Sequence, residues 1–575
     1  MPEDGSGEGS ASAEDGTADA ATGPDAWTDE EIYDPYASVG ERVFWADSVA
    51  DAIEASDPTE PIVIKGGVSP SGVPHIGHFN EILRNYFVAE ALRDRGHEVR
   101  QVFTTDDRDP LRKIPRTLAD LDWNVVDFGH ESVDSGAVGS NLGKPYTNIP
   151  DPFGCCDSYG DHFTQLLLDS AELIGVPVEF VSNTDLYEDG AFEDVTAHLL
   201  EHADEARSVL SEYQASVDED YTPFTPRCSE CGKLTGKVTA VDLDARTVAY
   251  VCADMEAGDR TIEGCGHEGT ATFREGKLPW RFEWPAQWQI LGVDFEPFGK
   301  DHAEGSWPSG QDIARNVLDI DPPVPMVYEW FTLNGDALSS SSGNIVTVAE
   351  VLDLLEPEVF RYFFTKDPRK QRDFDIGTLD QLVDEFDRLE RVYYDEFDPE
   401  DEDEEALADR VYPLLVDEVK PDRFRVPYTF AAVLGMTDDL ELREQMARRE
   451  GHVPEDAPVE AVHDALARVE KARTWAERTD NEYNYRLAED LPDVEFDADT
   501  GAALDELADF VEAGHDGEEI QGEIYETAKR HDVEVADFFE VGYRLFLDTD
   551  NGPRLGPFLA ALDEQFVLDR LRREA

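Results

Sequence analysis

The most constraining feature of this sequence is a short apolar run that breaks at a glycine pair and leads into a helical pattern. Residues 62–64, Ile-Val-Ile, predict a buried strand that is broken at Gly66. The stretch PSGVPHIGH follows at residues 70–78, and apolar residues then recur at helical spacing. A helix that begins near His75 would direct free backbone N–H groups toward the strand end, where anions bind. The histidines alone also suit an ordinary capping role.

The charge balance limits where such a chain can work. It has 575 residues, with 48 Lys and Arg against 129 Asp and Glu, which gives a net charge of −81. The length predicts several domains, and the self-repulsion is screened at molar salt, where the Debye length is about 3 Å. The acidity therefore indicates a salt-rich cytoplasm and a halophilic source. Residues 1–38 are predicted to be an acidic disordered tail without a secretory signal, and no run is suited to span a membrane.

All six cysteines fall in two groups that also contain other metal-ligand types. In a cytoplasmic chain of this size, zinc is favoured over a disulfide framework, which the count alone allows. We predict two structural Zn²⁺ sites. Whether Cys252 or His267 completes the second site stays open. The candidate ligands are Asp151, Cys155, Cys156 and His162 in the first group, and Cys228, Cys231, Cys252, Cys265 and His267 in the second.

The order of apolar patterns predicts an α/β region followed by an all-helical one. Strand and helix signals alternate over residues 39–325, as in parallel sheets with helical crossovers. The metal-ligand region interrupts them at about 141–275. A connecting region is expected at 326–375, and residues 376–575 show helical periodicity with almost no strand signal.

Several strings together resemble class I lysyl-tRNA synthetases of the archaeal type, from about residue 40 onward. They are PSGVPHIGHFNE, PDPFGCCDSYGDHF, GCGHEG, KLPWRFEWPAQWQILGVDFEPFGKDH and SSSSGN. The resemblance implies a Rossmann-like nucleotide-binding domain with a zinc-bearing insertion and an α-helical anticodon-binding domain. It implies ATP-dependent activation of L-lysine to lysyl-adenylate and transfer of the lysyl group to tRNA(Lys). ATP with Mg²⁺ would be the nucleotide, and we expect a cytoplasmic monomer that binds no membrane.

In that family the HIGH motif and a KMSKS-type loop hold ATP. The resemblance assigns catalysis to His75, Gly77 and His78. Lys300 is a further candidate, because it could replace the positive charge of the loop lysines that this sequence lacks. Both lysines of the loop motif are missing, so hydroxyl groups, backbone N–H groups, Mg²⁺ or Lys300 must stabilise the leaving pyrophosphate. By itself the serine run would be a flexible linker. The implied ATP-binding residues are Pro70, Ser71, Gly72, His75, Gly77, His78, Ala337, Leu338, Ser339, Ser340, Ser341 and Ser342.

The same resemblance implies a lysine pocket. Trp280 and His302 would flank the aliphatic stem of the substrate, and Tyr328 would form a polar wall. Trp280 alone also suits a core aromatic residue. No residue is assigned to the ε-ammonium group. The implied pocket residues are Gly67, Ser69, Trp280, Asp301, His302 and Tyr328.

Two basic stretches are candidates for tRNA phosphate contacts. RDPLRKIPR contains Arg108, Arg112, Lys113 and Arg116, and KDPRKQRDFD contains Lys366, Arg369, Lys370 and Arg372. Salt bridges to nearby carboxylates are the alternative for both. Other functions also stay open: a glutamyl or cysteinyl class I synthetase, a zinc-stabilised tRNA-binding protein without activation chemistry, or a nucleotidyltransferase that uses no tRNA.

Overall fold

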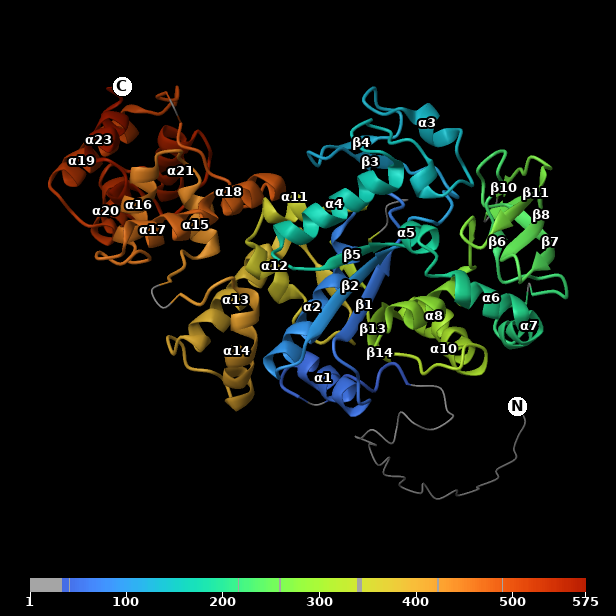
Figure 1. Ribbon diagram of the computed structural model, residues 1–575. Coiled ribbons are helices and arrows are strands. Elements are labelled where there is room, and N and C mark those ends of the chain that lie inside the picture. The colour runs from blue at the N-terminus through green and yellow to red at the C-terminus, as the bar shows by residue number, and fades with distance from the viewer. Residues whose placement is uncertain are drawn as a thin grey trace, which may run out of the picture.

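Five parallel strands form the central sheet of the protein (Figure 1). The computed structural model describes residues 34–574 except 41, 216, 258–259, 339–343, 421–422 and 489. Most of the predicted acidic tail, residues 1–33, therefore lies outside the described residues. Every strand pair is parallel, so the carboxyl ends meet at one edge. The strand order is β14 (Val324–Tyr328), β13 (Phe295–Gly299), β1 (Ile62–Val68), β2 (Val99–Thr105) and β5 (Glu179–Ser182).

Helices cover both faces of this sheet, as a buried parallel sheet requires. Ile62 and Ile64 of β1 pack into the core that contains α1 (Trp45–Ala55) and α2 (Phe79–Asp94). Val63 points to the opposite face, where it packs with tryptophans of α8 (Trp280–Leu291) and α10 (Ser306–Asn316). The predicted α/β fold class is confirmed.

The region predicted as one insertion consists of two excursions from the sheet. Strand β5 lies inside the predicted range 141–275, and it pairs with β2 at the sheet edge. The first excursion, between β2 and β5, carries α4 (Tyr159–Leu173). The second, between β5 and β13, forms an antiparallel ribbon of β7 (Gly236–Asp242), β8 (Thr247–Cys252) and β11 (Glu268–Thr272). The pairing of Glu179–Ser182 with β2 assigns this run to the edge of the sheet and not to the insertion.

The C-terminal part contains only helices among its described residues after β17 (Arg372–Phe374). Figure 1 shows it in orange and red, on the side of the sheet opposite the green ribbon. None of the described helices is both long and apolar enough to cross a membrane. The helices are α13 (Leu379–Tyr393), α14 (Glu402–Leu415), α15 (Tyr428–Leu434), α16 (Leu440–Arg449), α17 (Val459–Leu466), α18 (Arg468–Thr479), α19 (Ala498–Glu512), α20 (Gly517–Arg530), α21 (Val535–Leu547), α22 (Leu555–Ala561) and α23 (Glu564–Arg572).

Candidate active site and metal sites

The turn at residues 70–78, here called the HIGH turn, joins β1 to α2 at the carboxyl edge of the sheet. The backbone N–H of Gly77 donates to Nδ1 of His75 at 3.1 Å. The backbone N–H of His75 donates to Nδ1 of His78 at 3.1 Å. The two rings stack with their centroids 4.0 Å apart. The histidines therefore cap the turn and also face one another.

These hydrogen bonds fix the protonation of both histidines. Because each Nδ1 accepts a hydrogen bond, each neutral ring carries its proton on Nε2. Burial lowers the pKa of His75 well below its usual value, and His78 adds to the shift. Burial also lowers the pKa of His78, to about 4. At neutral pH both rings are thus uncharged, and each has an Nε2–H group available to a phosphate oxygen.

The segments on either side of the serine-rich loop approach the HIGH turn. A Cβ atom on Gly77 would lie 3.5 Å from Cδ1 of Leu338. The backbone N–H of Ile76 donates to the carbonyl oxygen of Val346 at 3.0 Å. Ala337 ends β16 (Asp336–Ala337) next to Leu338. The remaining predicted loop positions, Ser339, Ser340, Ser341 and Ser342, lie outside the described residues.

Two neighbouring segments support the other side of the HIGH turn. The hydroxyl group of Tyr159, the first residue of α4, donates to the carbonyl oxygen of Ser71 at 2.7 Å. Pro115 lies 4.0 Å from the position of a Cβ atom on Gly72. Ser71 itself is exposed, and Pro70 is buried. The turn is therefore held by the helix that follows the first cysteine group and by the segment after β2.

A half-buried carboxyl group that the sequence analysis missed lies between two predicted lysine-pocket residues. Oε1 of Glu81 accepts from the backbone N–H of Gly67 at 3.0 Å, and Oε2 accepts from the Tyr328 hydroxyl at 3.2 Å. Burial, with the negative charge of Glu296 nearby, raises the pKa of Glu81 to about 8. Its position three residues after His78, on the first turn of α2, is the signal that could have revealed it.

The other predicted pocket residues lie around the carboxyl ends of β1 and β13. The Trp280 ring lies 6.0 Å from the His302 ring between centroids and stacks on Trp284 at 5.6 Å. Asp301 is exposed, with its Oδ2 3.9 Å from Nε2 of His302. The hydroxyl group of Ser69 donates to Asp109 at 3.3 Å. Trp280 thus joins an aromatic cluster while keeping part of its ring accessible.

Lys300 is held by an ion pair beside this pocket. Its Nζ lies 2.5 Å from Oε2 of Glu329 and 5.1 Å from the centre of the Trp330 ring. The Glu329 carboxylate raises the pKa of Lys300, chiefly through their hydrogen bond. The side chain is therefore charged, and Glu329 is its present partner.

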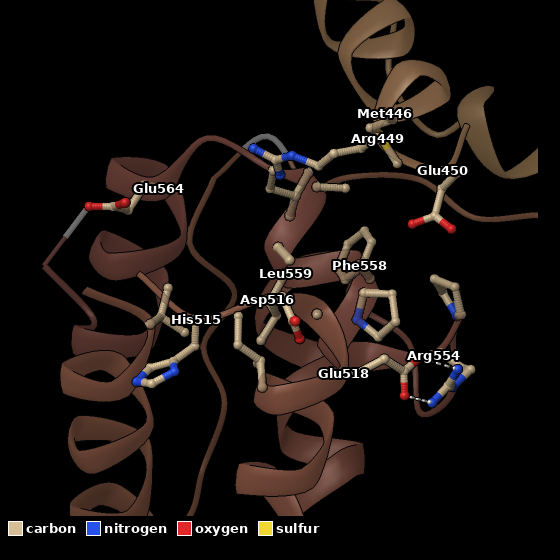
Figure 2. Close-up of a pocket in the computed structure, with 18 of the residues that line it drawn as sticks. Met446, Arg449, Glu450, His515, Asp516, Glu518, Arg554, Phe558, Leu559 and Glu564 are labelled. Atoms are coloured by element: carbon tan, nitrogen blue, oxygen red, sulfur yellow. Dashed lines mark hydrogen bonds and ion pairs between the residues drawn. The ribbon is translucent and has the colours of Figure 1, made fainter. Parts of the chain in front are cut away.

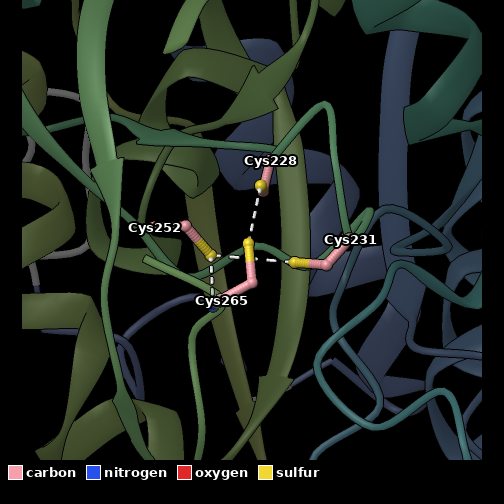
Figure 3. Close-up of side chains that lie close together, drawn as sticks. All are labelled: Cys228, Cys231, Cys252 and Cys265. Carbon is pink, nitrogen blue, oxygen red and sulfur yellow. Dashed lines mark hydrogen bonds between the residues drawn. The ribbon is translucent and has the colours of Figure 1, made fainter. Parts of the chain in front are cut away.

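Four cysteine sulfurs come together in the ribbon (Figure 3). Sγ of Cys228 lies 3.6 Å from Sγ of Cys265, and Sγ of Cys231 lies 3.7 Å from Sγ of Cys252. Tetrahedral Zn²⁺ with Zn–S bonds of about 2.3 Å requires sulfurs about 3.8 Å apart. Nε2 of His267 instead lies 3.2 Å from the Ser229 hydroxyl. The four sulfurs make a complete donor set without His267.

The second donor set gathers at the N-terminus of α4. Its members are Asp151, Cys155, Cys156 and His162. Nδ1 of His162 lies 3.3 Å from Sγ of Cys155 and 3.3 Å from Oδ1 of Asp151. Its Nε2 lies 2.8 Å from the carbonyl oxygen of Ala119, which fixes the proton there and leaves Nδ1 as a lone-pair donor. None of the six cysteines, all of which are described, forms a disulfide.

The two predicted basic stretches differ in their partners. In the first, Arg108 is buried and bonded to Glu188 at 3.2 Å, whereas Arg112 and Lys113 are exposed. In the second, Lys366 pairs with Glu385 at 2.8 Å and Arg369 with Asp367 at 3.0 Å. The salt-bridge alternative therefore describes two of the four basic residues of the second stretch, Lys366 and Arg369.

Comparison with known proteins agrees with this architecture. A family model described as tRNA synthetases class I (K) matches residues 43–416. This fold and its HIGH turn are those of a class I aminoacyl-tRNA synthetase. Within that class the chain belongs to the lysine–tRNA ligase family, as the sequence analysis expected.

The relatives of this chain carry the same name across near full-length alignments. Lysine–tRNA ligase of Haloarcula marismortui is 71% identical over 94% of this chain and 99% of its own length. That of Natronomonas pharaonis is 69% identical over 93% and 98%, respectively. That of Pyrococcus horikoshii is 32% identical over 92% and 100%. A glutamate tRNA ligase structure from Elizabethkingia meningosepticum covers 89% of this chain and 99% of its own, with 11% identity and a TM-score of 0.41.

Proposed function

We propose that this enzyme joins L-lysine to tRNA(Lys) in two steps. The lysine carboxylate attacks the α-phosphate of ATP, which forms lysyl-adenylate and releases pyrophosphate. The terminal ribose hydroxyl of the tRNA then attacks the lysyl carbonyl group, and AMP leaves. The observation that carries this proposal is the contact of the HIGH turn with both flanks of the serine-rich loop, at Leu338 and Val346. We place the reaction in the cytoplasm, where these substrates occur.

The HIGH turn would bind the phosphate groups without acid–base chemistry. Two neutral imidazoles, each with an Nε2–H group, are donors that can be oriented before ATP arrives. Such positioning supplies most of the catalysis in phosphoryl and adenylyl transfer. Mg²⁺ bound with ATP would neutralise phosphate charge. Gly77 would keep the space over the His75 ring open for the adenine.

Because both lysines of the loop motif are missing, other groups must supply the positive charge that stabilises the leaving pyrophosphate. Lys300 is our candidate, because it supplies a positive charge at the carboxyl end of β13. Its only ion pair in the described structure is with Glu329. Exchange of that carboxylate for pyrophosphate would bring one positive charge to the leaving group. The loop hydroxyl groups would add neutral donors.

Glu81 would recognise an ammonium group of lysine. Its carboxyl group bonds to Gly67 and Tyr328, two positions that the family resemblance places in the pocket. A cation entering this site would favour the ionised carboxylate, which burial otherwise disfavours. Trp280 and His302 would enclose the aliphatic stem.

Both donor sets fit structural Zn²⁺. The four-cysteine set has sulfur separations close to those of a tetrahedral site, and the second combines two thiols, an imidazole and a carboxylate. Zinc would clamp the ribbon in one case and the N-terminus of α4 in the other. Neither set belongs to the HIGH turn, so we assign no chemical step to either metal.

The helical part would read the anticodon. It contains a cavity of about 850 Å³ between α16, α20 and α22, shown in Figure 2. Phe558 and Met446 supply apolar lining, and Arg449 at the end of α16 supplies a guanidinium group. Unpaired bases are bound by this combination of stacking surface and cation.

ATP–pyrophosphate exchange in molar KCl tests the proposal directly. We expect exchange with L-lysine and not with glutamate or cysteine, which separates this enzyme from other class I synthetases. A protein that only binds tRNA would show no exchange with any amino acid. It would still retard a tRNA transcript in a gel.

A further inference from the structure

Two residues of the predicted lysine pocket come from segments that lie far apart in the sequence. Ser69 directly follows β1, whereas Trp280 is the first residue of α8. A pocket built from two such segments binds its ligand well only if their separation is fixed, because a small displacement of a positioned group weakens binding and catalysis. The contacts that hold the two segments together therefore bear on substrate binding.

A buried lysine connects one carboxylate beside Ser69 to another on α8. Nζ of Lys277 lies 2.8 Å from Oε2 of Glu283, and it is also ion-paired to Oδ1 of Asp109. The other oxygen of Asp109 accepts the hydrogen bond from the Ser69 hydroxyl group, at 3.3 Å. Glu283 lies on the first turn of α8, three residues after Trp280. The contacts thus run from Ser69 to the start of α8 through Lys277.

The ionic contact with α8 is shielded from water. The side chain of Lys277 is 7% exposed and that of Glu283 is 0% exposed. Burial acts to lower the pKa of Lys277, but the charges of Asp109 and Glu283 outweigh it and raise that pKa above its usual value. Lys277 is therefore charged at neutral pH, and both of its contacts are charge-assisted. Salt screens a buried pair much less than an exposed one, so the connection persists at molar salt.

A tyrosine fixes the α8 end of this arrangement. The hydroxyl group of Tyr187 donates to Oε1 of Glu283 at 2.7 Å and accepts from the backbone N–H of Leu278 at 2.8 Å. Tyr187 is fully buried. Both oxygens of Glu283 are therefore occupied, one by Tyr187 and one by Lys277, and its carboxylate has a defined position.

The backbone of Lys277 is held independently of the two carboxylates. Lys277 ends β12 (Gly276–Lys277), which pairs with β6 (Thr225–Pro226). Cys228 of the four-cysteine set follows two residues after β6. A substitution that removes only the ammonium group therefore leaves this strand pair in place.

We propose that Lys277 is a positioning residue for lysine binding, because it ties Asp109, and with it Ser69, to the turn of α8 that begins at Trp280. This proposal rests on the proposed function, since it takes Ser69 and Trp280 as residues that bind the substrate. Among the described residues, the Lys277 ammonium group bonds to the two carboxylates and not to the HIGH turn. It would therefore fix the width of the lysine pocket and leave the nucleotide site unchanged.

Removal of the ammonium group tests this role. The variant is Lys277→Met, assayed by pyrophosphate exchange with a lysine tRNA transcript present. We expect the KM for L-lysine to rise about tenfold, and the KM for ATP and kcat at saturating lysine to stay within a factor of about two. Loss of Lys277 alone leaves the buried Glu283 carboxylate without its cation, which destabilises the fold. Lys277→Met/Glu283→Gln avoids that charge and should show the same rise.

A conservative variant and a matched control complete the design. Lys277→Arg keeps a positive charge and can bridge two carboxylates, so its KM for lysine should stay within about threefold of the unmodified value. Lys237→Met is the control, because it removes a lysine from β7 of the ribbon, where Nζ lies 3.7 Å from Oδ2 of Asp220. It should leave the KM for lysine unchanged. Circular dichroism and zinc content establish that the variants are folded.

The possible outcomes separate this inference from the proposed function. An unchanged KM for lysine in both variants that lack the ammonium group overturns the inference. So does an equal rise in the KM for lysine and for ATP, or a Lys277→Arg variant as impaired as Lys277→Met, because a general loss of structure would explain either result.

If the unmodified enzyme catalyses no exchange with L-lysine, the proposed function fails. Calorimetric titration with L-lysine then decides the inference by itself. Weaker lysine binding by Lys277→Met than by Lys237→Met supports the positioning role. Equal binding by the two variants, or none by the unmodified protein, overturns it.

Discussion

The backbone N–H of Ile76 donates a hydrogen bond of 3.0 Å to the carbonyl oxygen of Val346. Ile76 lies within the HIGH turn, and Val346 follows the serine-rich loop. This bond requires the two segments to meet at one place, as a shared nucleotide site needs. Leu338, on the other flank of the loop, completes the contact over Gly77.

Gly77→Ala should abolish most activation without unfolding the enzyme. The new Cβ atom would lie 2.8 Å from the His75 ring and displace the imidazole that accepts the Gly77 N–H group. We expect lysine-dependent exchange to fall by about a hundredfold or more. Gly129→Ala is the control, because no atom lies within 4 Å of its Cβ position. Full activity of Gly77→Ala would contradict the role given to the turn.

The pH profile should show no histidine ionisation near the usual value. The pKa of His78 is about 4 and that of His75 lies well below its usual value, so both rings are neutral at neutral pH. The unfolded chain takes up these protons first, so the free energy of unfolding decreases as the pH falls from about 6.5 toward 4. His78→Ala should remove part of this decrease in urea unfolding curves. An inflection of kcat near pH 6.5 at saturating lysine that His75→Ala or His78→Ala abolishes would refute the assignment.

Glu81→Gln should impair lysine binding and leave ATP binding intact. Burial holds the pKa of Glu81 at about 8, and an ammonium ligand needs the carboxylate, so binding releases a proton below that pH. The lysine KM of the unmodified enzyme should therefore decrease as the pH rises toward 8, by up to about tenfold per unit. The variant should lose this dependence and have a higher KM. Glu90→Gln, which removes an ion pair with Arg93 on the same helix, should change neither value.

Metal analysis should find two zinc ions per chain. Cys252→Ser should lose one of them because it removes a donor of the four-sulfur set, and His162→Ala should lose the other. His267→Ala is the matched control, and it should retain both ions because its imidazole bonds to Ser229. If His267→Ala lost a zinc ion while Cys252→Ser kept both, the donor assignment would be wrong.

Removal of the Arg449 side chain should weaken tRNA recognition alone. Arg449 lines the helical cavity and has no carboxylate partner in the described part of the chain, whereas Arg554 on the same cavity bonds to Glu518 at 2.7 Å. We expect Arg449→Ala to raise the tRNA KM about tenfold and to leave pyrophosphate exchange unchanged. If Arg449→Ala charges a transcript with an altered anticodon as well as it charges the normal transcript, that result would support anticodon recognition in this cavity. No change in the tRNA KM would argue against it.

The sequence predicted the parts of this enzyme that depend on local patterns. The apolar run Ile62-Val-Ile and the later helical periodicity were sufficient to place β1 and α2. The predicted break at Gly66 was wrong, because β1 continues through Gly66 and Gly67 to Val68 and both glycines pair with β2. The periodicity at 379–393 likewise appears as α13. The four-cysteine group was predictable from spacing, but the choice of Cys252 over His267 depends on which side chain the ribbon turns inward, and spacing does not encode that.

Other features depend on contacts between distant segments. Glu81 looks like any acidic residue on the first turn of a helix, and only its hydrogen bonds to Gly67 and Tyr328 mark it as a pocket residue. Strand β5 was placed inside an insertion because its pairing with β2 cannot be read from its own residues. Arg112 and Lys113 have no carboxylate partner in the described ranges, and this was equally inaccessible from the sequence because it depends on which carboxylates other cations have engaged.

The contacts of the HIGH turn also determine when it can be completed during synthesis on the ribosome. Ser71 receives its support from Tyr159, and Ile76 from Val346. Because translation proceeds from the N-terminus, the nascent chain makes the turn early but provides its last partner only after more than half of the polypeptide has been made. A product truncated before Val346 would carry the motif and lack the partner that closes it, so premature termination there yields no complete nucleotide site.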